Sequence, residues 1–422
     1  MASDGLQLHG EAYNRPMPKT IRVTRGQIMA FRLQRLNLAR RARALGSAVG
    51  DLGLPDYPPG AALDALGARL VKPTPDTLDA AYEARALVRM RAMRGAPLVV
   101  RPADYDTFIA GVLPHDEAAM RAFIGPAMIS VRAAKSTALE AVSLVSQVTR
   151  RALARGPRDR DELHAELRDN LPEGLLPHCR GCNSNHAHPA LIYAVALDAR
   201  LVLFPREEGP YLLARFDRWL KKPQPARAQA RPSALLQRFL QAYAPATISE
   251  YAAWAGISTA QARRSWEALT SDLEPVQVEH AKQSSFVLSK DLEALTRARP
   301  DKESVHLLAP GDPLLQARDR ELFGDRAFQS IVWKNLSPRG IVLVGGEVAG
   351  VVRLRREKAT LRVSIQGSAD AGARATLEKE AAQLAQVRGL SDLQVEWTQA
   401  SQSPTPRRAR AAASSRQAQR GL

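Results

Sequence analysis

The N-terminal part of the chain shows one long helical pattern followed by a break. Apolar residues such as Ile28, Phe31 and Leu38 lie close to one stripe, which predicts a helix over 21–45. Arginines fill the positions between them, and they fit either a solvated helix face or a face that meets a polyanion. Proline and glycine dominate 53–60, where a turn is expected, and 61–70 is predicted to be helical.

Two later segments each run helix, helix, helix and hairpin, which is the order of a winged helix. In the second of them, Thr247 and Ser258 are expected to cap helices, and Gly256 to form the turn between these helices. The predicted elements are helices 137–154, 160–167 and 190–199 with strands 201–205 and 211–216, and then helices 233–243, 248–255 and 258–269 with strands 276–279 and 285–288.

From Ser304 the pattern changes to short β-rich runs that are separated by turns. Strands are predicted over 341–344, 347–355 and 359–365, followed by a helix over 371–386 and a last strand over 393–397. This spacing is typical of a meander or a small barrel. The two ends of the chain lack periodicity, so we expect a flexible arm over 1–19 and a disordered basic tail over 400–422.

Composition and charge narrow the function classes. The 422 residues correspond to about three domains of roughly 150 residues each. Lys and Arg number 60 against 43 Asp and Glu, and this formal net charge of +17 favours a polyanionic partner. No stretch reaches the roughly 18 apolar residues of a membrane span, and the N-terminus lacks a secretory signal pattern, so we expect a cytoplasmic protein without membrane contact.

The second predicted helix-turn-helix carries the candidate DNA contacts. In this motif the second helix enters the major groove, and its N-terminal half meets the base edges. Ala262, Trp266 and Leu269 share the opposite face and are expected to be core, as is Trp254. The residues left for DNA are Ser258, Thr259, Gln261, Arg263, Arg264 and, in the wing, Lys282. Winged helices also mediate protein contacts, which is the alternative interpretation of this module.

One cluster has the composition of a metal site. Cys179, Cys182, His186 and His188 supply four thiolate or imidazole ligands within ten residues, which suits a structural Zn²⁺ ion with no open coordination position. Ligand pairs in structural zinc sites are usually farther apart, so a buried cysteine pair with hydrogen-bonded histidines is the alternative. A thioredoxin-like redox motif is disfavoured, because no strand leads into this Cys-X-X-Cys.

The order of several short strings resembles a known family, the bacterial winged-helix DNA-binding proteins that include the AlkZ-like DNA glycosylases. The resemblance extends from about residue 20 to 398. The strings are Arg94-Gly-Ala-Pro97 with Asp104, Asp161-Glu-Leu-His164, Cys179-Arg-Gly-Cys182 with His186, Tyr243-Ala-Pro-Ala-Thr247 with Trp254-Ala-Gly256, Pro313, Ala317-Arg-Asp-Arg-Glu321, and Gly346-Glu-Val-Ala-Gly350.

This resemblance implies three tandem winged helices that form a concave DNA-holding body, followed by a C-terminal β-barrel. It supplies the first winged helix, which periodicity alone does not indicate. The expected fold is therefore α+β, with tandem winged-helix modules and a small C-terminal β-barrel. The expected domains are winged helices over 20–133, 134–222 and 232–298 and a β-barrel-like domain over 303–398, between the arm and the tail.

The chain departs from the family at the positions that carry its chemistry. Glycosylases of this family have a Gln-X-Gln or Gln-X-Asp motif that holds a water molecule beside the sugar, and the corresponding residues here are Pro55, Asp56 and Tyr57. Only Asp56 among them offers a carboxylate, and it also suits a turn beside a proline. Leu98 stands where related sequences often have a histidine.

We therefore expect a DNA-repair protein that holds double-stranded DNA in a basic concave surface. The first alternative is an active glycosylase that excises alkylated or crosslinked bases, with Asp56 as its candidate catalytic residue. The second alternative is a transcriptional regulator or an interaction module without DNA affinity.

Overall fold

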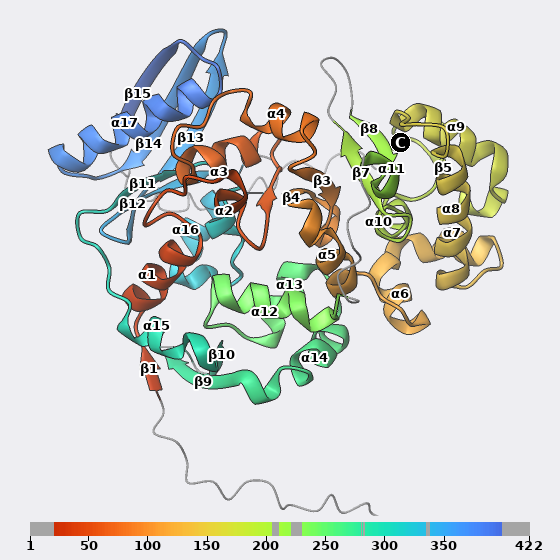
Figure 1. Cartoon of the computed structure of the whole chain (residues 1–422), viewed down its shortest axis with the longest axis horizontal. Helices are drawn as coiled ribbons and strands as arrows, with labels where there is room; N and C mark the ends of the chain where they lie inside the picture. The colour runs from red at the N-terminus through yellow and green to blue at the C-terminus, as the bar shows by residue number, and fades with distance from the viewer. Residues whose placement is uncertain are drawn as a thin grey trace, which may run out of the picture.

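The computed structural model describes residues 21–204, 211–220, 230–279, 281, 283–334 and 338–398. The predicted arm, the predicted tail and Lys282 lie outside the described residues. Figure 1 shows the helices α8 (Ala138–Ala152), α9 (Arg160–Asn170) and α10 (Pro189–Asp198) at one end of the molecule, and α17 (Ala371–Val387) with its sheet at the other.

The predicted helix over 21–45 is wrong in its bounds. Strand β1 (Ile21–Val23) pairs in parallel with β9 (Leu273–Val278), and only then does α1 (Arg25–Arg35) begin. Thr24 ends the strand and starts the helix, because its side chain and that of Gln27 form a reciprocal capping box. Asn37 has a φ of 57°, which ends the helix, and α2 (Leu45–Val49) follows separately.

The first and second units share one sheet. Its strand order is β2 (Leu54–Pro55), β4 (Pro97–Val100), β3 (Val88–Arg91), β7 (Leu201–Phe204) and β8 (Leu212–Arg215). The hairpin β7–β8 was predicted, and Arg89 opposite Leu203 joins it to the hairpin β3–β4. The helices around this sheet are α3 (Ala61–Arg69), α4 (Thr77–Glu83), α5 (Tyr105–Val112), α6 (Glu117–Ile124), α7 (Met128–Ala133) and α11 (Phe216–Trp219), besides α8, α9 and α10.

The third unit follows the predicted helix caps. Thr247 caps α13 (Ile248–Ala255), Gly256 ends it in the left-handed region, and Ser258 caps α14 (Thr259–Glu267). The other elements are α12 (Pro232–Tyr243), β9, β10 (Ser285–Leu288) and α15 (Leu292–Arg297). Strand β9 lies between β10 and the N-terminal β1, so this hairpin is also part of a larger sheet.

The C-terminal unit is an open sheet, so the predicted β-barrel is wrong. Its strand order is β11 (Val305–Leu308), β12 (Gly340–Val344), β13 (Glu347–Glu357), β14 (Thr360–Gly367) and β15 (Asp392–Thr398), and no pairing closes β11 onto β15 among the described strands. After β14 the chain crosses over through α17 and returns parallel to β14. Because α17 covers one face of the sheet, this face is buried without closure. Helix α16 (Arg326–Val332) lies between β11 and β12 in the sequence.

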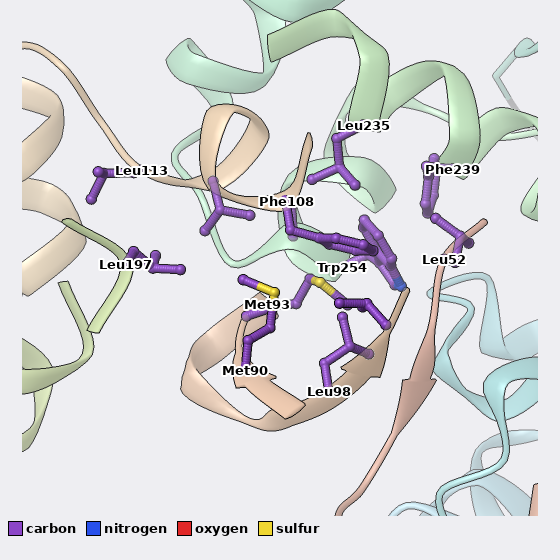
Figure 2. Close-up of a cluster of buried hydrophobic side chains, with 14 of the residues drawn as sticks. Leu52, Met90, Met93, Leu98, Phe108, Leu113, Leu197, Leu235, Phe239 and Trp254 are labelled. Atoms are coloured by element: carbon purple, nitrogen blue, oxygen red, sulfur yellow. The ribbon is translucent and has the colours of Figure 1, made fainter. Parts of the chain in front are cut away.

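The main hydrophobic core runs through several units. Figure 2 shows Met90 and Leu98 of the shared sheet beside Phe108 of α5 and Trp254 of α13, with Leu235 of α12 near Phe108. Gly111 permits this approach, because a Cβ atom there would lie 2.5 Å from the Cβ atom of Leu235. A continuous core therefore joins the units. The predicted domain boundaries stay predictions.

Candidate functional site

Helix α14 presents one polar face. The Oγ atom of Ser258 accepts a hydrogen bond from the backbone N–H of Gln261 at 3.2 Å, which fixes the start of the helix. Ala262 and Trp266 are buried, as their spacing predicted, and Thr259 and Arg263 lie exposed on the opposite side. The Arg263 side chain forms no hydrogen bond or ion pair with any residue that the structure describes. The exposed cation is therefore free to meet a phosphate or a base edge.

Gln261 is a correction to the predicted DNA contacts. Its side chain is buried, and Nε2 donates a hydrogen bond to the carbonyl oxygen of Val112 at 3.1 Å. The amide thus holds α14 against the end of α5, since a buried polar group needs a partner. Arg264 is exposed, but its guanidinium lies 3.1 Å from a carboxylate oxygen of Asp116.

Arg94 links the turn between β3 and β4 to the end of α13. Its guanidinium donates to the carbonyl oxygen of Ala253 at 3.4 Å and to Oε1 of Gln316 at 3.2 Å. Gly256 packs directly on it, because a Cβ atom at Gly256 would lie 2.7 Å from Cγ of Arg94. Burial lowers the pKa of Arg94, and the positive charge of Arg320 lowers it further. Two cations therefore lie together beside the end of α13.

The row of cations continues toward the C-terminal sheet. The guanidinium of Arg320 lies 4.8 Å from the centre of the Trp333 ring. The backbone N–H of Arg339 donates to the carbonyl oxygen of Val332, one residue before this tryptophan. Burial lowers the pKa of Arg339, and the charges of Arg353 and Arg355 add to this effect.

Strand β13 determines which way its arginines face. Val352 packs in the core beneath α17, whereas Val351 packs against the main core of the helical body. Because side chains alternate along a strand, Arg353 and Arg355 share the face of Val351. They therefore lie on the side of the sheet that is turned toward the helical body.

We call Arg94, Arg320, Arg339, Arg353 and Arg355 the central arginine surface. None of the five forms an ion pair with an acidic residue in the described part of the chain. Positive charges that lie close together without acidic partners are stabilised when an anion binds among them. Sequence reasoning missed this surface, because its members come from three distant segments and nothing local distinguishes them from other arginines.

Asp56 occupies a structural position. It is buried, its Oδ2 atom lies 2.7 Å from Nη2 of Arg89, and its Oδ1 atom accepts the backbone N–H groups of Gly60 and Ala62 at 3.0 and 3.3 Å. Both carboxylate oxygens of Asp56 thus already have partners within the protein. Leu98 lies in the hydrophobic cluster of Figure 2, and the neighbouring Tyr57 is 57% exposed.

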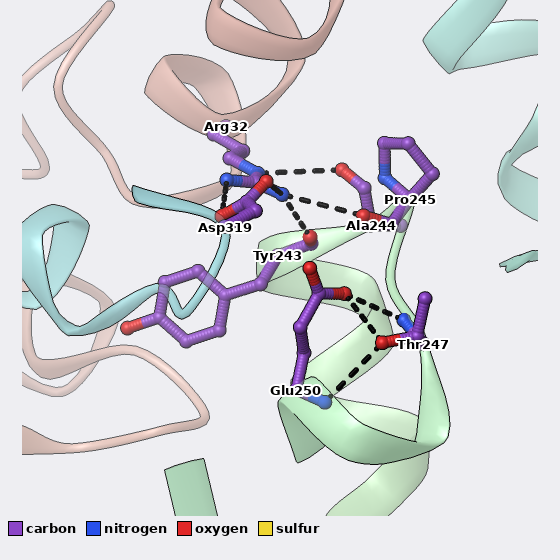
Figure 3. Close-up of polar contacts among 7 residues, drawn as sticks. All are labelled: Arg32, Tyr243, Ala244, Pro245, Thr247, Glu250 and Asp319. Carbon is purple, nitrogen blue, oxygen red and sulfur yellow. Dashed lines mark hydrogen bonds and ion pairs between the residues drawn. The ribbon is translucent and has the colours of Figure 1, made fainter. Parts of the chain in front are cut away.

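Arg32 contacts two of the short strings that resemble the family, the one over 243–247 and the one over 317–321. Figure 3 shows its guanidinium between Asp319 and the carbonyl oxygens of Tyr243, Ala244 and Pro245. The two nitrogen–oxygen distances to Asp319 are 2.9 and 2.7 Å, and the Arg32 side chain is 1% exposed. Arg32 thus ties α1 both to the segment around Asp319 and to the chain at the end of α12, which is a structural role.

Three of the four predicted metal ligands lie together. The ligand atoms of Cys179, Cys182 and His186 are all within 4.8 Å of one another. His188 is a correction, because its Nδ1 atom accepts the backbone N–H of Ala190 at 3.1 Å and thereby caps α10. Hydrogen bonds from the Cys182 backbone, from His186 and from the Cys182 thiol lower the pKa of Cys179 to about 6. A thiolate is thus favoured at neutral pH.

Comparison with known proteins assigns the family. The family model described as DNA glycosylase AlkZ-like matches residues 49–387. The chain belongs to the AlkZ-like DNA glycosylase family. The fold of this AlkZ-like protein is similar to that of the Streptomyces sahachiroi DNA glycosylase AlkZ, with a TM-score of 0.71 and 21% identity over 90% of this chain and 100% of that one. A search of curated proteins gave no match. Within the described residues, no helix has the length and apolar character needed to cross a membrane.

Proposed function

We propose that this AlkZ-like protein binds double-stranded DNA in DNA repair, across α14 and the central arginine surface. The observation that carries the proposal is the run of arginines from Arg94 to Arg355 without acidic partners among the described residues. Arginine on phosphate gives affinity that does not depend on sequence, and α14 would add contacts in a groove. Membership of the family supports the same substrate class.

Salt dependence of duplex binding tests the proposal. If six or more phosphates are neutralised, the affinity is expected to fall about 1000-fold or more between about 50 and 200 mM salt. The double variant Arg353→Ala, Arg355→Ala should lower the slope of log K against log salt by about 2, because each lost phosphate contact removes about 0.9.

A matched variant provides the control. Arg356→Ala, Arg374→Ala removes the same charge, but Arg356 lies on the other face of β13 and Arg374 on α17, against Trp397. This control should leave the slope nearly unchanged. Equal effects of the two double variants would contradict a DNA site on the central arginine surface. Absence of duplex binding at low salt would favour the interaction-module alternative.

The AlkZ-like family favours excision of alkylated bases as a second candidate function. Asp56 is a poor candidate for this chemistry, because Arg89, Gly60 and Ala62 engage both of its oxygens. Release of a modified base from alkylated duplex, measured for the wild-type protein and for Asp56→Asn, distinguishes the two candidates. Release that survives in Asp56→Asn would require another catalytic residue, and no release from either protein would favour binding alone.

A further inference from the structure

The Cys179 cluster is built by a small hairpin between α9 and α10. Strands β5 (His178–Cys179) and β6 (Ser184–Asn185) pair, so the chain between them folds back on itself. The fold brings Sγ of Cys182 to 4.0 Å from the carbonyl oxygen of Cys179, and His186 follows directly after β6. In the described part of the chain, this is the one group of three or more metal-ligating side chains.

The histidine of this cluster is oriented for a metal ion. Nδ1 of His186 lies 2.9 Å from the carbonyl oxygen of Ala187. Since a carbonyl oxygen only accepts, Nδ1 donates to it, which leaves Nε2 as the ring nitrogen that can meet Cys179 or a metal ion. A backbone carbonyl that fixes the second ring nitrogen is a common partner of metal-ligating histidines. Two cysteine sulfurs and one imidazole nitrogen are a donor set that suits Zn²⁺.

Neither of the two neighbouring histidines completes a four-ligand site. The His188 ring accepts the Ala190 amide and is thereby turned to the start of α10. His164 of α9 stacks on His186 with ring centres 5.4 Å apart and planes inclined by only 16°. Because a lone pair of imidazole lies in its ring plane, two nearly parallel rings do not direct their lone pairs at one ion.

A cavity of about 600 Å³ lies beside the cluster. Cys182 and His186 form part of its wall, together with the arginines Arg91, Arg160 and Arg168. Asp161 also lines the cavity and pairs with Arg160 at 3.1 Å. Cationic side chains in the wall of a cavity suit an anionic ligand.

We propose that Cys179, Cys182 and His186 bind one Zn²⁺ ion whose fourth coordination position opens into this cavity. Water occupies this position, and a small anion from the cavity can displace it. Three protein ligands and one exchangeable ligand distinguish this centre from a closed structural site, in which four protein ligands surround the ion.

Metal analysis of tag-free protein tests the binding of the ion. One equivalent of zinc is expected in the wild-type protein, and a loss of most of it in Cys182→Ser and in His186→Ala. His178→Ala is the matched control, because His178 is exposed and its ring hydrogen-bonds to Asn185, outside the group of Cys179, Cys182 and His186. Wild-type protein without zinc that also fails to take up added Zn²⁺, or a disulfide between the two cysteines, would overturn the proposal.

Cobalt substitution tests the open position. Co²⁺ in place of Zn²⁺ should give thiolate charge-transfer bands, and added azide or thiocyanate should change the ligand-field bands. His164→Ala should leave this response intact. A spectrum that ignores both anions in the wild-type protein and changes in His164→Ala would indicate a closed four-ligand site and refute the open one. This measurement on the wild-type protein remains decisive even if a ligand variant fails to fold.

Discussion

Replacement of Asp56 by asparagine should destabilise the protein. Its Oδ2 atom lies 2.7 Å from Arg89, and the two side chains are only 8% and 16% exposed. Asparagine keeps an acceptor for the backbone N–H groups of Gly60 and Ala62, but its NH₂ group would face the guanidinium, donor against donor. Nε of Arg89 already lacks a partner among the described residues, so the cation would stay buried without an acid.

The magnitude follows from the burial of the pair. Removal of one partner of a buried ion pair costs about 3–5 kcal/mol, and the partial exposure of Arg89 favours the lower end. We therefore expect Asp56→Asn to lower the free energy of unfolding by about 3 kcal/mol. Urea unfolding followed by tryptophan fluorescence measures this change, with the slope of free energy against urea as a check that the same transition is observed.

Asp51 supplies the matched control for Asp56. It precedes β2, which Asp56 follows, and it pairs with Arg101 at 2.6 Å, but its side chain is 59% exposed. Asp51→Asn should cost at most about 1 kcal/mol, because solvent screens an exposed pair. Equal costs for the two variants would refute the burial argument. Loss of base release in Asp56→Asn without loss of stability would instead identify Asp56 as catalytic.

Two further predictions concern buried charges near the C-terminal sheet. Asp312→Asn should lower the free energy of unfolding by about 4 kcal/mol, because Arg69 and Asp312 form a bidentate pair that is almost fully buried. The double variant Arg69→Met, Asp312→Leu should lose less in urea unfolding, and a larger loss would contradict this reasoning. Burial lowers the pKa of His306 from 6.5 to about 4, so its neutral form stabilises the fold above pH 6.5 and this contribution is lost as the pH falls toward 4. Between pH 7.5 and 5 the wild-type protein should therefore lose about 2 kcal/mol more than His306→Phe, and equal losses would refute the assignment.

The sequence predicted part of the candidate DNA interface on α14. The caps Thr247 and Ser258 and the apolar spacing of Ala262 and Trp266 place α14 and its exposed face, because these signals act within a few residues. Gln261 follows the same helical pattern, yet the end of α5 covers it. No periodicity within α14 reveals which distant segment packs on it.

Arginine illustrates the same limit on a larger scale. Arg32 and Arg263 have identical chemistry, but Arg32 lies buried against Asp319 and three carbonyl oxygens, while Arg263 is exposed. The central arginine surface exists only because the turn at Arg94 meets the segment around Arg320, and because β13 turns one face toward the helical body.

The sequence by itself determined most helices, their caps, the hairpins and the basic character of the chain, because hydrophobic period, capping and charge are properties of neighbouring residues. Only the tertiary structure decided that the first residues of the predicted N-terminal helix form strand β1 and pair with β9. It also decided that the C-terminal sheet stays open. It also decided that three rather than four of the predicted metal ligands meet. Each of these outcomes depends on contacts between distant segments, whose free energy comes from burial and pairing that no local pattern records.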